Sequence, residues 1–155
     1  MQIEVLADPD AVAERAAVLI ASEARTAVTE RRRFVMAVSG GHTPWMMLRA
    51  LAGQPLIPWS NMHVFQVDER VAPQGDADRN LTPLSESLLS RSPLPPAQVH
   101  PMPVEHTDLT AAAESYAVKL REIAGSPPTL ELVHLGPMAT LPLWCRAIQF
   151  SRSLT

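Results

Sequence analysis

Apolar and polar positions fall into alternating blocks along this chain, and the blocks predict strands separated by helices. Apolar runs at residues 34–38, 63–67 and 130–135 have the length and composition of buried strands. An alanine-rich segment that ends near Thr29 has apolar residues at helical spacing, namely Val12, Ala16, Leu19, Ile20, Ala24 and Ala27. Strands that alternate with amphipathic helices are typical of an α/β domain with a parallel sheet flanked by helices.

Capping and turn-forming residues define the expected ends of these elements. Asp8 or Asp10 is expected to cap the first helix. Asp108 is expected to cap a helix over residues 109–124, for which Gly125 is the stop signal. Three shorter elements are expected: an edge strand at residues 2–6, a helix at 82–90 and a strand at 98–100.

Length and composition favour one globular domain. The 155 residues are 46% hydrophobic and 19% charged, which is enough apolar material for a core. The net charge of −3 argues against a nucleic-acid-binding surface, and Arg31-Arg32-Arg33 is expected to lie in a solvated loop. No secretory pattern or membrane-length apolar run is seen, and the single cysteine, Cys145, fits a reducing compartment. We therefore expect a cytoplasmic protein without nucleic-acid or membrane partners.

The histidines do not suggest a metal site. Four of them are expected at the surface or in turns, namely His42, His63, His100 and His106. His134 lies inside a predicted strand, where a hydrogen-bonded core histidine is the simpler interpretation. No spacing of His, Cys and Asp resembles a set of metal ligands, so no metal or other cofactor is expected.

The turn after the first buried strand is the strongest candidate for a binding site. Ser39-Gly40-Gly41 follows the strand, and Thr43 and Pro44 are expected to cap and open the next helix. Glycines let a ligand approach the backbone, and free N–H groups at a helix N-terminus attract anions. The pattern indicates a phosphorylated small molecule, although such turns also occur simply to redirect the chain. Neither a Walker A motif nor a complete G-x-G-x-x-G fingerprint is present, so a nucleotide is not indicated.

A charged triplet, Asp68-Glu69-Arg70, follows the second buried strand. By itself it is as consistent with the start of a solvated loop as with a site. The carboxyl ends of parallel strands share one edge of the sheet, however, and ligands bind there. The triplet and the glycine turn are therefore expected to face the same site. Arg79, in the polar loop over residues 71–80, is a candidate bidentate clamp for phosphate.

Four motifs occur in a characteristic order. They are Val-Ser-Gly-Gly-His-Thr-Pro at 38–44, Phe-Gln-Val-Asp-Glu-Arg at 65–70, Asp-Arg-Asn at 78–80 and Leu-Val-His-Leu-Gly at 132–136, with Trp59 before the second strand. Together they resemble the 6-phosphogluconolactonases of the glucosamine-6-phosphate isomerase/6-phosphogluconolactonase superfamily. Asp-Glu-Arg resembles the lactonase form, whereas the deaminases of this superfamily usually carry Asp-Glu-Tyr.

This resemblance implies a Rossmann-like parallel sheet and a reaction without a cofactor. The reaction is hydrolysis of 6-phospho-D-glucono-1,5-lactone to 6-phospho-D-gluconate, in the oxidative pentose phosphate pathway. The substrate, a small sugar phosphate, would be held at the turn by Ser39, Gly40, Gly41 and Thr43. The candidates for neutralising its phosphate are Arg70 and Arg79. Asp68 and Glu69 are the candidate catalytic acids, and Asp68 would orient the water or the base.

The resemblance ends near residue 136. The family continues with Asp-Gly-His-Thr-Ala-Ser-Leu, whose histidine is its general base, whereas this chain continues with Pro-Met-Ala-Thr-Leu-Pro from Pro137. With permitted codons, the same nucleotides read from the last base of the Pro137 codon give Asp-Gly-His-Thr-Ala. We therefore expect a partial sugar-phosphate-binding domain over residues 1–136 and an out-of-frame tail over 137–155. The sheet would be incomplete at its C-terminal end, and the missing base would leave this truncated chain with little or no activity.

Two other functions stay open. A sugar-phosphate isomerase or deaminase would need an enolising base, for which Asp68 is the candidate. A sugar-phosphate-binding remnant would keep the phosphate half-site without any chemistry. Ammonia release from glucosamine 6-phosphate would favour the first, and binding of 6-phosphogluconate without turnover would favour the second.

Overall fold

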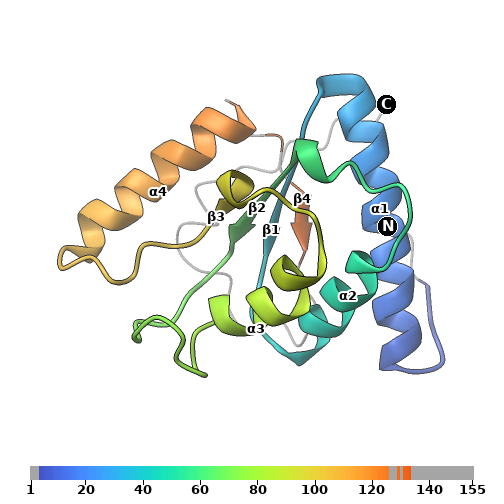
Figure 1. Ribbon diagram of the computed structural model, residues 1–155, viewed down its shortest axis with the longest axis horizontal. Helices are drawn as coiled ribbons and strands as arrows, with labels where there is room; N and C mark the ends of the chain where they lie inside the picture. The colour runs from blue at the N-terminus through green and yellow to red at the C-terminus, as the bar shows by residue number, and fades with distance from the viewer. Residues whose placement is uncertain (1–3, 126–128, 130, 134–155) are drawn as a thin grey trace.

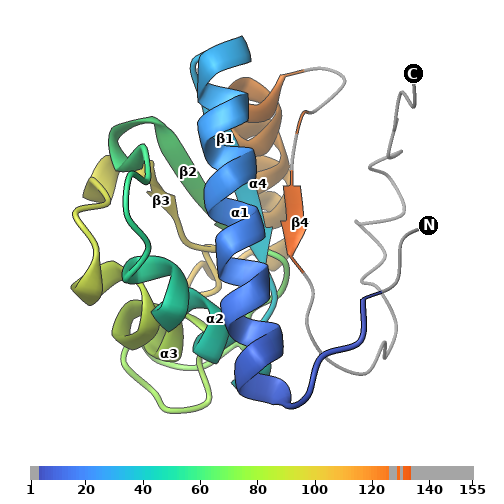
Figure 2. The ribbon, with the colours of Figure 1, turned by 90° about the vertical axis from the view of Figure 1, so that its right-hand side faces the viewer.

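A parallel sheet covered by helices on both faces forms the centre of the molecule, which confirms the predicted α/β class (Figures 1 and 2). The structure, a computed structural model, describes residues 4–125, 129 and 131–133. Four strands in this part form one sheet in the order β3-β2-β1-β4: β1 (Phe34–Val38), β2 (Met62–Gln66), β3 (Val99–His100) and β4 (Glu131–Val133). The helices are α1 (Pro9–Arg31), α2 (His42–Ala52), α3 (Leu81–Ser87) and α4 (Leu109–Ala124), with 3₁₀ turns at Trp59–Asn61, Leu89–Arg91 and Pro96–Gln98.

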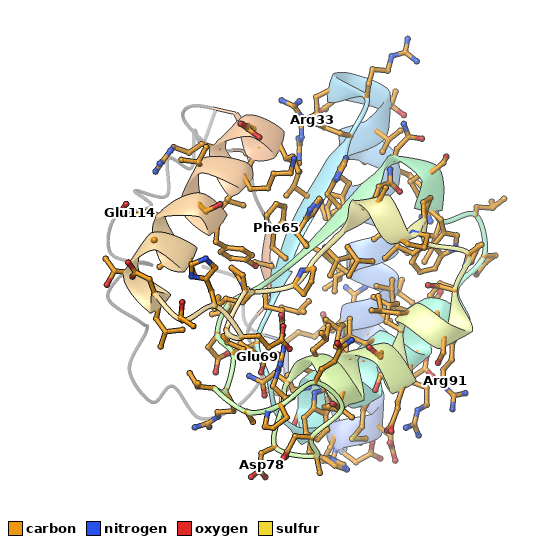
Figure 3. The ribbon with its side chains drawn as sticks, turned by 60° about the vertical axis from the view of Figure 1, so that its left-hand side comes forward. Arg33, Phe65, Glu69, Asp78, Arg91 and Glu114 are labelled. Atoms are coloured by element: carbon orange, nitrogen blue, oxygen red, sulfur yellow. The ribbon has the colours of Figure 1, made fainter. Side chains whose placement is uncertain are left out.

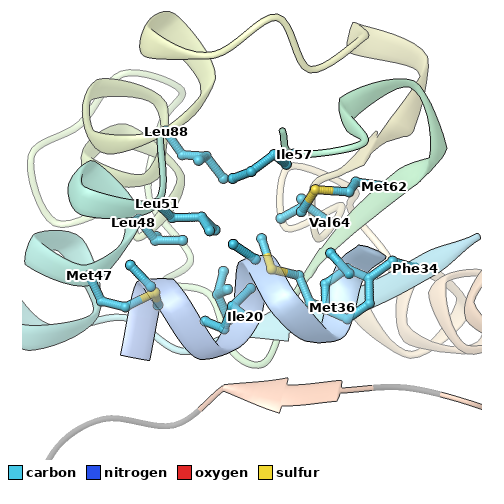
Figure 4. Packing of buried hydrophobic residues seen from close by; sticks show 14 of the residues in the cluster. Ile20, Phe34, Met36, Met47, Leu48, Leu51, Ile57, Met62, Val64 and Leu88 are labelled. Atoms are coloured by element: carbon cyan, nitrogen blue, oxygen red, sulfur yellow. The ribbon is translucent and has the colours of Figure 1, made fainter. Parts of the chain in front are cut away.

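Both faces of the central strand are buried, as its unbroken apolar run predicts. All five residues of β1 are buried because alternate side chains point to opposite faces of the sheet. Phe34, Met36 and Val38 join the larger core between the sheet and α1, α2 and α3 (Figure 4). Val35 and Ala37 instead join the smaller core under α4. The two covering layers leave the ends of the strands as the place for a site.

Helix α1 confirms its predicted cap but not its predicted buried stripe in detail. The Asp8 Oδ1 atom accepts a hydrogen bond from the Ala11 N–H at 2.8 Å, and the helix runs to Arg31. Leu19, predicted to be buried, is 45% exposed. The buried positions of α1 are Ala13, Ala17, Ile20, Ala21, Ala24 and Ala27. Small alanines on this face let the helix lie close to the sheet.

The edge strand predicted at residues 2–6 does not form over its described part, residues 4–6. Val5 is 90% exposed, so its side chain does not pack in the core. Glu4 instead forms an exposed ion pair with Arg15 of α1, at 2.9 Å.

The remaining predicted elements form, some with the predicted bounds and some with shifted ends. Helix α4 has the predicted bounds, and the Asp108 carboxylate accepts from the backbone N–H groups of Thr110 and Ala111, both at 3.0 Å. The helix predicted at 82–90 is divided into α3 and the 3₁₀ turn Leu89–Arg91. The third predicted strand is described as β4, while His134 and the expected tail over 137–155 lie outside the described residues. Of the described helices, none has both the length and the apolar character needed to cross a membrane.

His63 and His100 were expected at the surface or in turns, and the structure corrects this. They lie on neighbouring strands, half-buried, with His63 Nδ1 3.1 Å from His100 Nε2. The His100 ring also stacks on Phe65, with ring centres 4.4 Å apart. Burial, His63 and Lys119 lower the pKa of His100 to about 4. Burial, Arg33 and Lys119 also lower the pKa of His63.

This histidine pair predicts a loss of stability in mild acid. The unfolded chain, with an ordinary histidine pKa near 6.5, takes up a proton that folded His100 refuses until about pH 4. The stabilisation is therefore complete above about pH 6.5 and decreases as the pH falls towards 4. Allowing for solvent screening at a half-exposed ring, we expect a loss of about 1 kcal/mol in unfolding free energy between pH 7 and 5. Urea unfolding measures it, and His100→Phe should flatten the dependence; an equally steep dependence in that variant would contradict this explanation.

The side-chain hydroxyl of Tyr116, in α4, hydrogen-bonds the backbone of β2 at Gln66. The Gln66 N–H donates to the Tyr116 hydroxyl at 2.8 Å, and this hydroxyl lies 3.0 Å from the Gln66 carbonyl and 3.2 Å from that of His100. Tyr116→Phe would leave the buried N–H without its partner. We expect it to destabilise the fold by about 1–3 kcal/mol in urea unfolding, and an effect near zero would show that water replaces the hydroxyl.

Candidate active site at the carboxyl ends of β1 and β2

The order of the strands places the glycine turn where ligands bind in open parallel sheets. From β1 the chain moves outward through β2 and β3, and it returns with β4 on the other side of β1. The direction of winding therefore reverses at β1, and ligands bind outside the carboxyl ends of strands at such a reversal. The Ser39-Gly40-Gly41 turn leaves β1 at this point, as predicted.

Helix α2 begins earlier than predicted because Gly41 occupies its N-cap. Gly41 has φ 122° and ψ 161°, a conformation that residues with a Cβ rarely adopt. Thr43 was expected to be the cap, but it is the second residue of the helix and its side chain makes no capping bond. Pro44 is the third residue rather than the first. It is tolerated there because the N–H groups of the first turn have no intrahelical acceptor.

Asp68 and Gly40 face each other across the two strand ends. The Gly40 N–H lies 3.5 Å from Asp68 Oδ1, at the outer limit of a hydrogen bond. On the other side of Asp68, the Asn80 Nδ2 group donates to the backbone oxygen at 3.1 Å and to Oδ2 at 3.3 Å. The structure therefore brings the turn and the first acid of the triplet together, as the sequence predicts.

The Glu69 side chain, labelled in Figure 3, is fully buried. Burial alone would raise the pKa of Glu69, but its hydrogen bonds outweigh burial and hold the pKa below its usual value. Those bonds come from Gln66 Nε2 at 2.8 Å and from the backbone N–H groups of Arg70 at 2.7 Å, Asn80 at 2.7 Å and Leu81 at 2.9 Å. Because both oxygens of the Glu69 carboxylate already accept hydrogen bonds, this side chain is suited to holding the loop over residues 71–80 in place.

Arg79 lies behind the site, in an ion-pair network with two glutamates. Its side chain is 1% exposed, with Nε 3.3 Å from Glu69 Oε2 and Nη1 2.6 Å from Glu105 Oε1. Nη1 also donates to the Ala72 carbonyl at 2.9 Å. Although burial opposes it, the two carboxylates raise the pKa of Arg79 above its usual value. This position differs from that of the expected phosphate clamp, because the guanidinium is enclosed and already paired.

Arg70 has the accessibility that a phosphate-binding residue requires. It is exposed and directly follows the buried Glu69. Within the described part of the chain, its side chain forms no hydrogen bond or ion pair, and its backbone N–H is held by Glu69 at 2.7 Å. The guanidinium is therefore exposed and not engaged by another side chain in this part of the chain.

Ser39, the first residue of the turn, is buried. It is 7% exposed, and its hydroxyl has no hydrogen-bond partner among the described residues. A small cavity beside it is lined also by Gly40, Trp45, Gln66 and Asn80, with room for about one water molecule. A sugar phosphate is much larger, so it would lie over the turn and not inside this cavity. Among the described residues, including those of the site, no cluster of His, Cys, Asp and Glu is arranged to hold a metal ion.

Sequence reasoning missed three polar residues that organise the site. Gln66 joins Glu69 to the backbone N–H of Met102, Asn80 contacts Asp68, and Glu105 closes the Arg79 network. A polar Gln66 inside a buried apolar strand was a usable signal, because buried amides need partners. Glu105 had no such signal, since it lies in an irregular segment far along the chain.

Comparison with known proteins identifies the family. Residues 7–137 match the family described as "Glucosamine-6-phosphate isomerases/6-phosphogluconolactonase". The chain belongs to this family. Among its curated members, the 6-phosphogluconolactonase of Mycobacterium leprae is 37% identical over 144 residues, and that of Synechocystis sp. is 34% identical over 139. The alignments cover 88% and 87% of this chain but 58% of each relative, so the chain spans little more than half the length of these family members.

Solved structures of the glucosamine-6-phosphate isomerase/6-phosphogluconolactonase family show the same fold. The 6-phosphogluconolactonase of Thermotoga maritima superposes with a TM-score of 0.68 at 26% identity, covering 77% of this chain and 53% of that one. A monomeric glucosamine-6-phosphate deaminase superposes with a TM-score of 0.70 at 16% identity, which supports the fold alone.

Proposed function

We propose that this chain carries the substrate-binding half of a 6-phosphogluconolactonase, an enzyme that hydrolyses 6-phospho-D-glucono-1,5-lactone to 6-phospho-D-gluconate. The observation that carries the proposal is the contact at the strand reversal between the glycine turn, which leads into α2, and the half-buried Asp68. The exposed Arg70 follows two residues after Asp68. Relatives named 6-phosphogluconolactonase at 34–37% identity support the same assignment.

The geometry suits a phosphorylated lactone. Arg70 and the N–H groups in the first turn of α2 would bind the phosphate, and this remote anchor would fix the lactone ring relative to Asp68. Water then adds to the lactone carbonyl carbon, the bond from that carbon to the ring oxygen breaks, and the ring oxygen leaves as a hydroxyl after taking a proton. Asp68 would orient the attacking water or the group that deprotonates it.

The general base is the part that this sequence does not supply. The chain contains no Asp-Gly-His segment, which the resemblance gives as the source of that base. A positioned base is worth about a hundred- to ten-thousand-fold in rate. The proposal therefore includes binding of sugar phosphate with weak or absent turnover, in the cytoplasm and without a cofactor.

Lactone hydrolysis, followed by proton release and corrected for spontaneous hydrolysis, tests the assignment. We expect no rate above background for this chain, and a strong rate for a version whose frame is restored after residue 136. An inactive restored chain would contradict the lactonase assignment. Turnover by the 155-residue chain itself would show that residues before 137 hold a sufficient base.

The out-of-frame origin of residues 137–155 is part of the same proposal. The family match ends at residue 137, where the expected change of frame lies. Sequencing the gene decides it, because codons that do not give Asp-Gly-His in the shifted frame would exclude this origin.

A further inference from the structure

We propose that Asn80 is a positioning residue of this site, which sets the separation between Asp68 and the glycine turn while Glu69 holds it in place. The proposal deepens the proposed function and rests on it for the identity of the ligand. Its structural part depends on contacts among four residues of the chain.

The first contact, between Glu69 and the N-terminus of α3, explains why the Asn80 side chain can bond Asp68. An asparagine that precedes a helix ordinarily accepts a hydrogen bond from a backbone N–H of the first turn. Asn80 precedes α3, yet its side chain makes no such bond. Glu69 bonds the Asn80 and Leu81 N–H groups instead, at 2.7 and 2.9 Å. Because the Glu69 carboxylate, just after β2, binds these N–H groups, the Asn80 side-chain amide can bond Asp68 instead.

The second contact fixes Asp68. The Asn80 Nδ2 group donates both to the Asp68 backbone oxygen and to its Oδ2 atom, at 3.1 and 3.3 Å. These bonds leave the other carboxylate oxygen, Oδ1, facing the Gly40 N–H at 3.5 Å. The Asn80 amide therefore orients the Asp68 carboxylate relative to the glycine turn.

The third contact fixes the turn itself. A Cβ built on Gly40 would lie 2.1 Å from Asn80 Oδ1 and 2.7 Å from its Nδ2, far inside contact distance. Gly40 is not among the residues with positive φ, so steric contact with Asn80 is the reason for a glycine here. Asn80 thus packs on the Gly40 backbone and bonds Asp68 at the same time, which makes it the spacer between the two.

A double-mutant cycle tests this arrangement in the full 155-residue chain. Gly40→Ala is expected to lower the melting temperature by several degrees in the wild-type background and by much less in the Asn80→Ala background. Gly53→Ala is the matched control, since a Cβ there meets the Ala50 oxygen at an ordinary 3.5 Å; its effect should be the same in both backgrounds. If Asn80→Ala does not fold, Asn80→Gly replaces it, because glycine has no side chain to meet a Cβ at position 40 and is tolerated at a helix N-cap. An equal cost of Gly40→Ala in both backgrounds would overturn the proposal.

Binding of 6-phosphogluconate separates positioning from mere stability. Asn80→Asp keeps the shape of the amide but loses its donor and adds a charge beside Asp68. We expect it to preserve the steric cost of Gly40→Ala while weakening 6-phosphogluconate binding at least tenfold; unchanged affinity would overturn the positioning role. If wild-type protein shows the Gly40–Asn80 coupling but binds no 6-phosphogluconate, the spacer stands and the proposed function fails.

Discussion

Glu69→Gln is expected to destabilise the fold by about 3–5 kcal/mol, because it breaks a buried ion pair and leaves Arg79 without its inner partner. The two side chains are 0% and 1% exposed. A glutamine keeps the size of the side chain but replaces one acceptor oxygen with a donor, opposite N–H groups that already donate. Urea unfolding followed by circular dichroism measures the change.

Glu105→Gln is the matched control within the same network. Glu105 contacts Arg79 at 2.6 Å, but its side chain is 55% exposed, so solvent screens the pair. We expect its substitution to cost about 1 kcal/mol or less. Equal losses for the two variants would show that burial of Glu69 does not determine the strength of the network.

Arg70→Ala is expected to weaken binding of 6-phosphogluconate by about 10- to 100-fold with little change in stability. A charge-assisted hydrogen bond to phosphate is worth about 1.5–3 kcal/mol, and the exposed side chain supports no described part of the fold. Isothermal titration calorimetry measures the affinity.

Arg33→Ala is the control for the loss of one positive charge. Arg33 is exposed and lies just before β1, at the end of the sheet opposite Glu69 (Figure 3). Its substitution should leave 6-phosphogluconate binding nearly unchanged. Similar losses for Arg33→Ala and Arg70→Ala would indicate a general effect of charge instead of a phosphate contact at Arg70.

The elements that the sequence predicts best have a local physical signal. Helix α4 has a capping aspartate and a terminal glycine, and β1 is an uninterrupted apolar run, so both were found with their correct bounds. Residues 4–6 had the composition of a strand, but no described strand pairs with them. The predicted start of α2 was wrong because its N-cap is Gly41, which has a positive φ. Thr43 and Pro44 are residue types that favour a helix start, so they indicated a later one.

The sequence predicts where the site lies better than it predicts what each residue does there. Strand ends share an edge, so Asp68 and the glycine turn could be brought together from the sequence alone. The sequence could not distinguish the half-buried Asp68 from the buried Glu69, or the exposed Arg70 from the enclosed Arg79. These differences depend on contacts made by Gln66, Asn80 and Glu105. Several of these contacts join residues far apart in the chain, such as Gln66 with Met102 and Arg79 with Glu105, and local patterns do not predict which residues pair in this way.

A titration of the ¹⁵N-labelled chain with 6-phosphogluconate, followed by amide chemical shifts, tests the central claim most directly. We predict saturable shifts confined to Gly40, Gly41 and the first turn of α2, together with residues 68–70 and Asn80. The absence of saturable shifts, or shifts centred away from the carboxyl ends of β1 and β2, would contradict a sugar-phosphate site at this edge of the sheet.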